Sequence, residues 1–270
     1  MEDMVKEVQE QMEKDAAKII NKLDVSEQFY TVQCEGVTTG VPAYFIRLRS
    51  CNLMCGGAGG NMMKTGEATW WCDTEYVWRN GFGVPFHKIE QKFEIENIAE
   101  WVKTGRVHLI WTGGEPTIPK HQRGIVAFLD WYYDKHKDAA LYNEIETNGT
   151  IYIEDELFDR LQQINCSPKL QNSGMDARRR INPEALKRIM EHDNYWFKFV
   201  ISNEDDIKEI ERDFIEPHDI PVSRVLMMPG LDKQENFHER TEFCLQMAKK
   251  YGYIGLTRLH ISAWDQTTGV

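Results

Sequence analysis

Three of the six cysteines in this 270-residue chain lie close together in the sequence, at Cys51, Cys55 and Cys72. Thiolates grouped in this way could bind zinc or an iron-sulfur cluster. A zinc finger normally offers close cysteine pairs and four ligands, whereas the candidates for a fourth ligand here are the isolated Cys34 and a few distant histidines. Three thiolates on a four-iron cluster leave one iron open. The pattern therefore favours a [4Fe-4S] cluster that binds a further molecule.

A glycine-rich stretch separates the second of these cysteines from the third. Residues 56–71 contain five glycines, and glycine allows a chain to loop out and turn back without steric conflict. The entropic cost of closing a loop rises only slowly with its length, so the stretch need not prevent Cys72 from joining the same cluster. Its role stays open: it could cover the site, contact an electron donor, or have no function.

The overall composition favours an enzyme that acts on a small molecule. Hydrophobic residues make up 41% of the chain, which is enough for one sizeable core. The 32 basic and 43 acidic residues give a net charge of -11, which opposes direct binding to a nucleic acid. No segment resembles a membrane span or a signal peptide. We therefore expect a cytoplasmic protein with no membrane or direct nucleic-acid partner.

Apolar residues recur at helical spacing over residues 2–23 and predict an amphipathic helix there. This helix could pack on the rest of the chain or on a second copy of it. We expect an N-terminal helical extension over residues 1–25 and one domain over residues 26–270.

The remaining sequence alternates between strand-like and helix-like segments. Strands are expected at 29–33, 42–48, 106–112, 141–147, 163–167, 195–201, 222–228 and 254–260, and helices at 95–103, 120–136, 154–162, 183–192, 204–213 and 235–251. Repeated strand-helix units predict an α/β fold with a parallel sheet, either doubly wound or curled into a complete or partial barrel. In a barrel, the loops that follow the strands meet at one mouth, where the cysteines would join the GGEP, NGT and SPK segments.

Taken in order, these segments resemble one protein family. Cys51 and Cys55 form C-x3-C, and WWCDTE supplies an aromatic residue before the third cysteine. This resembles the C-x3-C-x-aromatic-C signature of radical S-adenosylmethionine enzymes, in which only two residues normally separate the second cysteine from the third. From about residue 28 onward the chain is similar to the 7-carboxy-7-deazaguanine synthases. The matching segments are VQCEG (32–36), GVPAYFIRLRSCNL (40–53), WCDT (71–74), TGGEPTI (112–118), ETNGT (146–150), SPKL (167–170), KFVI (198–201) and RLH (258–260).

The resemblance implies a partial (β/α) barrel with its active site at the carboxyl ends of the parallel strands. It implies a lyase that converts 6-carboxy-5,6,7,8-tetrahydropterin to 7-carboxy-7-deazaguanine with loss of ammonia, in queuosine-type 7-deazapurine biosynthesis. The cofactors would be a [4Fe-4S] cluster on Cys51, Cys55 and Cys72, S-adenosylmethionine, and Mg²⁺. Reductive cleavage of S-adenosylmethionine at the open iron would release a radical that abstracts hydrogen from the substrate.

By the same resemblance, a set of residues at the mouth would bind S-adenosylmethionine. Gly114 suits a strand end at which a Cβ would collide with the cofactor, although an ordinary strand-to-helix turn is the alternative. Trp71 is also expected to shield the cluster, and the segment around Asn148 could be only a turn. The residues expected to contact this cofactor are Trp71, Asp73, Gly114, Glu115, Asn148, Ser167, Pro168 and Lys169.

A second set would bind the substrate and magnesium. The planar guanidinium of Arg47 suits a pterin carboxylate. The hydroxyl of Thr74 would bind Mg²⁺, with a helix cap as the alternative, and His260 could face the substrate or be structural. The residues expected to contact the substrate are Val32, Gln33, Cys34, Glu35, Arg47 and Thr112.

Cys34 departs from the family, which usually has glycine at that position, and could be mistaken for a cluster ligand or replace one. The expected partners are an electron-donor protein such as flavodoxin or ferredoxin, and a second copy of the chain in a homodimer. Two alternatives stay open. One is another radical enzyme, such as an activase that forms a glycyl radical, and the other is a noncatalytic interaction protein stabilised by zinc.

Overall fold

The computed structural model describes residues 21–230 and 233–270, and a single sheet runs through this part of the chain. The strands lie in the order β3-β1-β2-β4-β5-β6-β7-β8-β9. β1 is antiparallel to β2 and β3, whereas the neighbours from β2 through β9 are parallel. Their bounds are β1 Lys22–Val32, β2 Pro42–Leu48, β3 Phe82–Pro85, β4 His108–Gly113, β5 Asn143–Thr147, β6 Gln163–Cys166, β7 Tyr195–Ile201, β8 Val225–Pro229 and β9 Ile254–Gly255.

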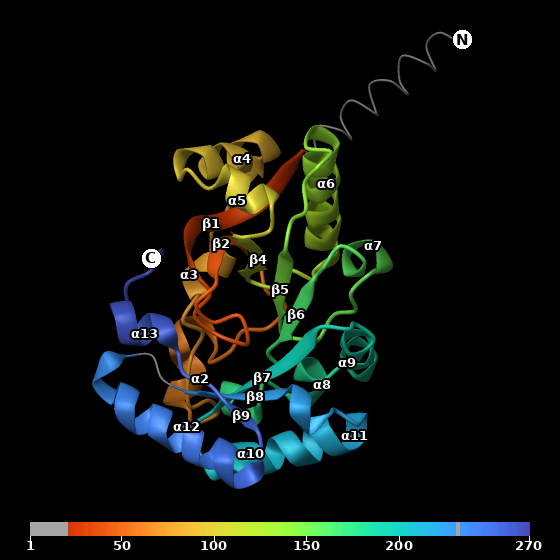
Figure 1. The fold of residues 1–270 in the computed structure, drawn as a ribbon. Coiled ribbons are helices and arrows are strands. Elements are labelled where there is room, and N and C mark those ends of the chain that lie inside the picture. Colours follow the sequence, from red (N-terminus) through yellow and green to blue (C-terminus); the bar gives the residue numbers. More distant parts are fainter. Residues whose placement is uncertain (1–20, 231–232) are drawn as a thin grey trace.

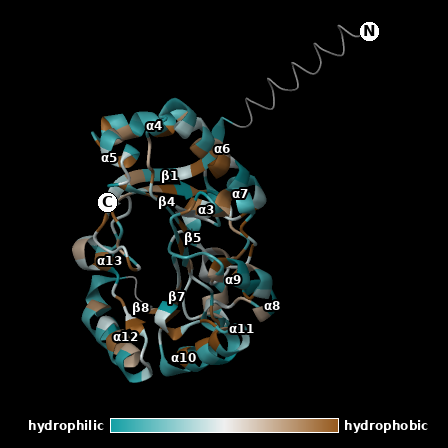
Figure 2. Ribbon diagram, turned by 45° about the vertical axis from the view of Figure 1, so that its right-hand side comes forward, coloured by the Kyte–Doolittle hydropathy of each residue, from teal (hydrophilic) through white to brown (hydrophobic). Residues whose placement is uncertain are grey.

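Helices cover the outer face of this sheet (Figure 1). The α-helices are α2 Asn61–Lys64, α3 Glu75–Arg79, α4 Phe86–Ile95, α5 Ala99–Lys103, α6 Pro119–Lys135, α7 Asp155–Phe158, α8 Ala177–Arg180, α9 Pro183–Met190, α10 Glu204–Ile210, α11 Glu216–His218, α12 Phe237–Tyr251 and α13 Leu259–Trp264. Figure 2 shows the strands as an arc, with α4, α6, α9, α10 and α12 outside it. A doubly wound sheet would carry helices on both faces. The fold is therefore a partial barrel.

Alternation along the strands separates the core from the inner face of the barrel. Tyr44 and Ile46 on β2 and Trp111 on β4 are buried in the main core, between the sheet and the outer helices. Phe45 on β2 pairs with Ile110 on β4, and both belong to a separate apolar cluster on the other face of the sheet. Because successive side chains of a strand point to opposite faces, the inner face is free to carry the polar residues of a site.

The N-terminal part of the fold differs from the sequence-based expectation. β1 begins at Lys22, although a strand was expected only over 29–33. It is long because it pairs with β2 and also, over its first four residues, with β3, which was not expected. The helix expected over 2–23 lies mostly outside the described residues, and Lys22 and Leu23 belong to β1 instead. The helix α4 was also missed.

The C-terminal strand is shorter than expected. The sequence predicted a strand over 254–260, but β9 covers only Ile254–Gly255, and α13 begins at Leu259. The chain leaves the sheet because the backbone N–H of Leu259 donates to the carbonyl oxygen of Cys34, at 3.1 Å. This contact carries the chain across the inner side of the barrel.

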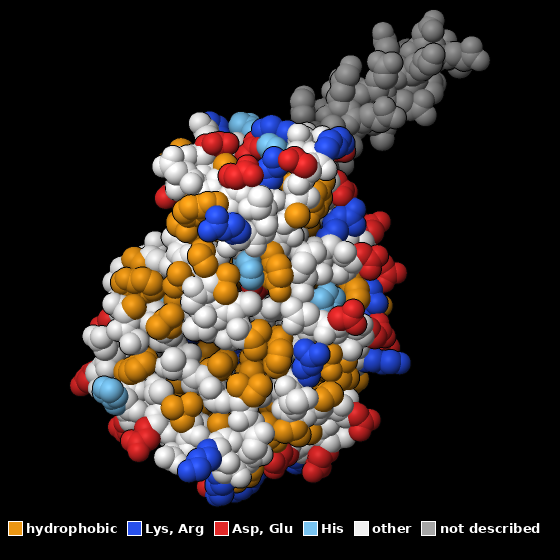
Figure 3. Space-filling view, viewed as in Figure 1, with side chains coloured by type: hydrophobic (Ala, Val, Ile, Leu, Met, Phe, Trp, Pro, Cys, Tyr) orange, Lys and Arg blue, Asp and Glu red, His pale blue; other side chains and the backbone are white. Residues whose placement is uncertain are grey.

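The surface carries mixed charges. On the face in Figure 3, acidic and basic side chains are mixed at the top and on the right, and hydrophobic side chains are scattered over the middle. None of the helices in the described ranges combines the length and the apolar content that crossing a membrane requires.

Candidate active site

A cavity of about 1440 Å³ opens at the carboxyl ends of the parallel strands. It brings together residues that are far apart in the sequence, as the barrel interpretation predicted. Among the residues proposed from the sequence, Pro168 is buried and does not line the cavity. The proposed residues that do line it are Val32, Gln33, Cys34, Glu35, Arg47, Cys51, Cys55, Trp71, Cys72, Asp73, Thr74, Thr112, Gly114, Glu115, Asn148, Ser167 and Lys169.

The three clustered cysteines lie on one side of this cavity. Cys51, Cys55 and Cys72 pack in a small apolar cluster with Leu53 and Met175. Burial, with Glu115 and the neighbouring thiols, raises the pKa of Cys51 to about 12. Burial likewise raises the pKa of Cys55 to about 11, although the charge of Lys169 opposes the rise. Such thiols are protonated at neutral pH, and a bound cation would release their protons.

The donor set fits an iron-sulfur cluster in residue type and proximity. Within residues 21–230 and 233–270, however, no group of three His, Cys, Asp or Glu side chains is already arranged to hold a metal ion. Each thiolate of a four-iron cluster binds a different iron, so the cluster does not need three side chains gathered around one ion. The apolar surroundings suit a cluster that must be kept from water, and the mutual repulsion of the thiolates favours a cation among them.

The glycine-rich insertion folds back so that Cys72 returns to Cys55. The N–H of Gly56 donates to the carbonyl oxygen of Ser173 at 2.8 Å, and the indole N–H of Trp70 donates to Oδ1 of Asn172 at 2.8 Å. Gly56 has a φ of +73°, and a Cβ there would lie 2.4 Å from Cα of Trp71. Glycine is thus required where the two arms of the insertion meet. Trp71 lines the cavity but is 49% exposed, so it stands at the rim.

Glycine is required at position 114 of the GGEP segment, but for a different reason from the collision with the cofactor that was expected. A Cβ on Gly114 would lie 1.8 Å from the carbonyl oxygen of Ser50, and the N–H of Gly114 donates to the carbonyl oxygen of Leu48 at 2.7 Å. The N–H of Glu115 donates to the carbonyl oxygen of Ser50 at 2.8 Å. The protein's own cysteine-bearing loop therefore excludes a side chain at Gly114.

The carboxylate of Glu115 ties this segment to the loop after β5. It is fully buried and accepts hydrogen bonds from the N–H and hydroxyl of Thr117, the hydroxyl of Thr147 and the N–H of Asn148. Burial raises its pKa even though these donors favour the charged form. The Asn148 amide in turn donates to Oδ1 of Asn52, beside Cys51, at 2.9 Å. Glu115 thus acts here by fixing loops around the cysteines.

The hydroxyl of Thr74 is not used as a helix cap. Thr74 precedes α3, but its side chain makes no capping hydrogen bond. Its Oγ1 lies 3.4 Å from Sγ of Cys72. On the wall formed by the SPK segment, Nζ of Lys169 donates to Oγ of Ser167 at 3.3 Å.

The opposite side of the cavity carries the residues expected to bind the substrate. Arg47 donates to Glu27 at 2.9 Å and to the hydroxyl of Tyr76 at 3.0 Å, and its guanidinium stacks over the ring of Phe29. The buried Gln33 accepts from the N–H groups of Cys34 and Glu35, and so fixes the backbone of that segment.

Comparison with known proteins decides the family. The 7-carboxy-7-deazaguanine synthase of Pyrobaculum aerophilum is 32% identical over 250 residues, covering 92% of this chain and 97% of the relative. The synthase of Rhodopirellula baltica is 29% identical over 268 residues, with 94% and 91% covered.

The chain belongs to the 7-carboxy-7-deazaguanine synthase family. It is accordingly an enzyme, a lyase of the radical S-adenosylmethionine type, as expected from the sequence. QueE from Escherichia coli has the same fold, with a TM-score of 0.60 at 19% identity over 88% of this chain and 95% of that one. No family model matches the chain.

Four residues that line the cavity were not proposed from the sequence or were left undecided. Glu146 accepts from Gln33 and from the hydroxyl of Thr112, at 3.3 and 2.7 Å. The other three, Lys198, Arg258 and His260, surround Glu35. A lysine within the apolar strand YWFKFVI, and glutamates at two-residue spacing within β5, were the signals that could have identified Lys198 and Glu146.

Glu35 is held as a carboxylate by two cations. Nζ of Lys198 lies 2.5 Å from one of its oxygens, and Nε of Arg258 lies 3.0 Å from the other. Although burial alone would raise it, these charges hold the pKa of Glu35 well below its usual range. An anion is thus kept at the end of β1.

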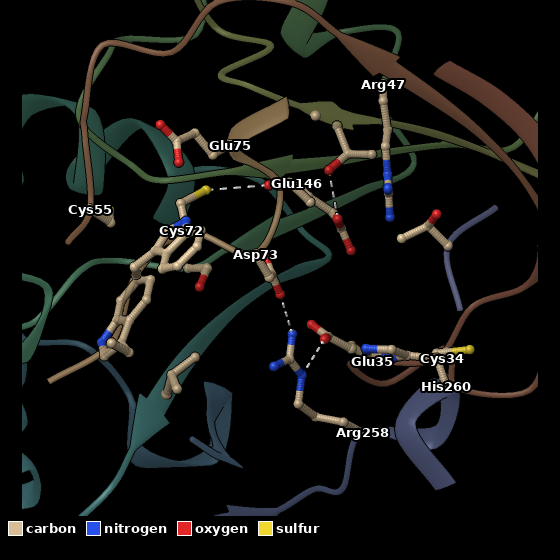
Figure 4. A pocket seen from close by; sticks show the side chains of 18 of the residues that line it. Cys34, Glu35, Arg47, Cys55, Cys72, Asp73, Glu75, Glu146, Arg258 and His260 are labelled. Atoms are coloured by element: carbon tan, nitrogen blue, oxygen red, sulfur yellow. Dashed lines mark hydrogen bonds and ion pairs between the residues drawn. The ribbon is translucent and has the colours of Figure 1, made fainter. Parts of the chain in front are cut away.

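Cys34 does not join the other cysteines. Figure 4 shows it beside Glu35 and His260, across the cavity from Cys55 and Cys72. Its thiol donates to the carbonyl oxygen of Val32 at 3.3 Å, and burial raises its pKa to about 11. The structure therefore argues against Cys34 as a fourth ligand.

Proposed function

We propose that this chain converts 6-carboxy-5,6,7,8-tetrahydropterin to 7-carboxy-7-deazaguanine with loss of ammonia, using the residues of the cavity. One observation carries the assignment to these residues: three neighbouring cysteines, of which Cys55 is buried, line the same cavity as a set of charged groups suited to a carboxylated pterin. The cavity opens where the loops of a β/α barrel build active sites. Its size leaves room for a nucleoside cofactor and a bicyclic substrate together.

In this proposal, Cys51, Cys55 and Cys72 hold a [4Fe-4S] cluster. When bound, the cluster and S-adenosylmethionine supply a carbon radical that can abstract a hydrogen atom from the substrate. Leu53 and Met175, which pack against the cysteines, keep water from this side of the cavity.

S-adenosylmethionine would lie between the cysteines and the loops after β4, β5 and β6. The proposed contacts come from Trp71, Asp73, Gly114, Asn148, Ser167 and Lys169, which line the cavity around the cysteines. The hydroxyl of Ser167 and the ammonium of Lys169 offer a donor pair for polar atoms of a nucleoside. Glu115 is engaged by its own loops, so its proposed contribution is the position of the GGEP backbone.

The pterin would lie on the opposite side of the cavity. Arg47 is proposed to bind its carboxylate, since its guanidinium lines the cavity and can hold a planar anion with two parallel hydrogen bonds. The substrate carboxylate would then share Arg47 with Glu27 or replace it. Glu35 is proposed to accept hydrogen bonds from the amino edge of the pterin, and Val32, Gln33, Cys34 and Thr112 to complete that wall.

We also propose that Thr74 contributes a ligand to Mg²⁺. Its hydroxyl is not committed to the cap of α3, and the magnesium ion accepts a hydroxyl oxygen together with water and substrate oxygens. The ion would link the cysteine side of the cavity to the substrate.

A one-electron donor protein such as flavodoxin or ferredoxin would reduce the cluster in the cytoplasm, and the product would enter queuosine-type 7-deazapurine biosynthesis. The catalytic domain would form a homodimer. It includes residues 22–25, which were expected to belong to an N-terminal extension but are part of β1.

Anaerobic reconstitution tests this function. Purified protein would be loaded with iron and sulfide, then incubated with carboxytetrahydropterin, S-adenosylmethionine, Mg²⁺ and dithionite. We expect 7-carboxy-7-deazaguanine and ammonia in equal amounts by mass spectrometry and an ammonia assay. Cleavage of S-adenosylmethionine without that product would contradict the proposed substrate. A colourless protein that contains zinc would contradict the radical mechanism.

A further inference from the structure

Arg258 joins the two sides of the cavity. Its Nε lies 3.0 Å from Oε1 of Glu35, and its Nη2 lies 2.9 Å from Oδ2 of Asp73. Figure 4 shows the guanidinium between these two carboxylates. Glu35 follows β1, whereas Asp73 directly follows Cys72. A single side chain therefore connects the substrate side to the residue next to the third cysteine.

The Glu35 end of this connection is rigid. The side chains of Glu35, Lys198 and Arg258 are only 16%, 7% and 14% exposed, and the carboxylate lies between the two cations. The backbone N–H of Leu259 also donates to the carbonyl oxygen of Cys34. Separating such buried charges would leave one of them without its partner, which is costly. Arg258 is thus fixed relative to β1.

The Asp73 end is the adjustable one. The side chain of Asp73 is 56% exposed and lines the cavity. Asp73 lies just after the insertion and pairs with Arg258. On the other side of Cys72, Trp70 is hydrogen-bonded to Asn172. The third cysteine therefore lies between two anchors, Trp70 before it and Asp73 after it.

The insertion explains why a second anchor is needed. In the family signature two residues separate the second and third cysteines, so the covalent chain alone restricts where the third can lie. Here residues 56–71 separate them, and a loop of that length permits many positions for Cys72. The position of Cys72 must therefore be fixed by noncovalent contacts.

We propose that Arg258 is a positioning residue that holds Cys72 in place through Asp73. This contact would do what a two-residue gap between the second and third cysteines does in the family signature. This inference rests on the proposed function in one respect, namely that Cys72 is a ligand of the cluster. The contact itself exists without any cofactor. It can therefore be tested in metal-free protein as well as in the loaded enzyme.

A double-mutant cycle on metal-free protein gives the first test. The variants are Arg258→Gln, Asp73→Asn and the two combined, and the readout is the rate of limited proteolysis within residues 56–71. Each single variant should be cleaved roughly tenfold faster than the parent, because local opening becomes easier. The double variant should be no worse than either single one, because both remove the same contact. Additive effects would overturn the proposal.

Arg188→Gln serves as the matched control. Arg188 is also largely buried, at 12% exposure, and makes ion pairs with Asp155 and Glu191, but it does not line the cavity. Arg188→Gln can lower the stability of the protein, but it should not raise the rate of cleavage within residues 56–71 relative to the rate at other sites. If Arg188→Gln accelerates cleavage of the insertion as much as Arg258→Gln, the effect is general loosening and the proposal is wrong.

The second test uses the reconstituted enzyme. Arg258→Gln should retain less iron and sulfide and should alter the electron paramagnetic resonance spectrum of the reduced cluster. Arg258→Lys, which reaches only one carboxylate, should recover part of both signals. A spectrum and iron content identical to the parent would overturn the proposal. If the parent itself binds no cluster, the proposed function fails, whereas the proteolysis cycle still decides the contact between Arg258 and Asp73.

Discussion

The backbone N–H of Cys72 donates a hydrogen bond to the carbonyl oxygen of Cys55, at 3.2 Å, although the whole insertion lies between them. The two residues are thereby neighbours in space, as they are in the sequence signature of the family. The insertion is a loop that begins at Gly56 and ends at Trp71, next to its starting point. The cysteine group is preserved despite the long gap in the sequence.

The cysteines therefore have distinct expected roles. Replacing Cys51, Cys55 or Cys72 by alanine should abolish the cluster, because a four-iron cluster depends on each thiolate that holds it. Iron and sulfide analysis after anaerobic reconstitution measures this. Cys34→Ala and Cys244→Ala are the controls and should retain the parental iron content. A full cluster in Cys72→Ala would refute the ligand assignment.

Gly114→Ala should destabilise the protein. The added Cβ would lie 1.8 Å from the carbonyl oxygen of Ser50, so the cysteine-bearing loop must move. Overpacking of this kind costs about 1–3 kcal/mol in the free energy of unfolding. Urea denaturation of metal-free protein measures it. Gly83→Ala is the control, since the nearest atom to its Cβ would be Cδ of Lys22 at 3.5 Å, an ordinary contact. Equal stability of the two variants would contradict the prediction.

Arg47→Ala should weaken the use of the pterin. Loss of a charge-assisted hydrogen bond costs about 1.5–3 kcal/mol, so kcat/KM for the pterin should fall about 10- to 150-fold. The dissociation constant for S-adenosylmethionine should not change. Steady-state kinetics and a binding titration distinguish these effects. Arg106→Ala, which removes an arginine stacked on Trp101 away from the cavity, should leave both unchanged.

Thr74 should determine the response to magnesium. Thr74→Ala removes the hydroxyl and should abolish the stimulation of turnover by Mg²⁺, whereas Thr74→Ser retains the hydroxyl and should preserve most of it. Initial rates over a magnesium titration measure this. Equal magnesium dependence in both variants would show that the ion does not use this side chain.

Metal-free protein should lose stability at alkaline pH. Burial raises the pKa of Cys51 to about 12 and of Cys55 to about 11 from the ordinary value of 9.0, so the folded state holds these protons when the unfolded state has released them. The free energy of unfolding should therefore be fully retained below about pH 9 and fall as the pH rises above it. Denaturation of Cys51→Ala over the same pH range should show a shallower fall. Stability that rises with pH in this range would be incompatible with buried, protonated thiols.

The sequence predicted the central elements of the barrel, and every residue proposed for the site except Pro168 lines the cavity. The strand over 195–201 coincides with β7, because YWFKFVI is a continuous run of strand-forming residues. Arg47 and the cysteines were recognised because their residue types and spacing follow a family signature. Short-range patterns were sufficient for these features.

The missed features depend on long-range pairing. β1 extends to Lys22 because β3 pairs with its first residues, and nothing within β1 itself indicates this. Arg258 was expected within a strand over 254–260, whereas it follows β9 and its guanidinium pairs with the carboxylates of Glu35 and Asp73. The reason for Gly114 likewise required the position of Ser50, a residue far from it in sequence.

The link from Arg258 to Asp73 also orders events during translation. A ribosome that has reached residue 257 has already made Cys51, Cys55 and Cys72, but not the arginine that holds the last of them in place. The nascent chain thus exposes three thiols before their final arrangement can form. If Arg258 positions Cys72 as proposed, the cluster would find all three ligands in their final arrangement only after the C-terminal segment has been made.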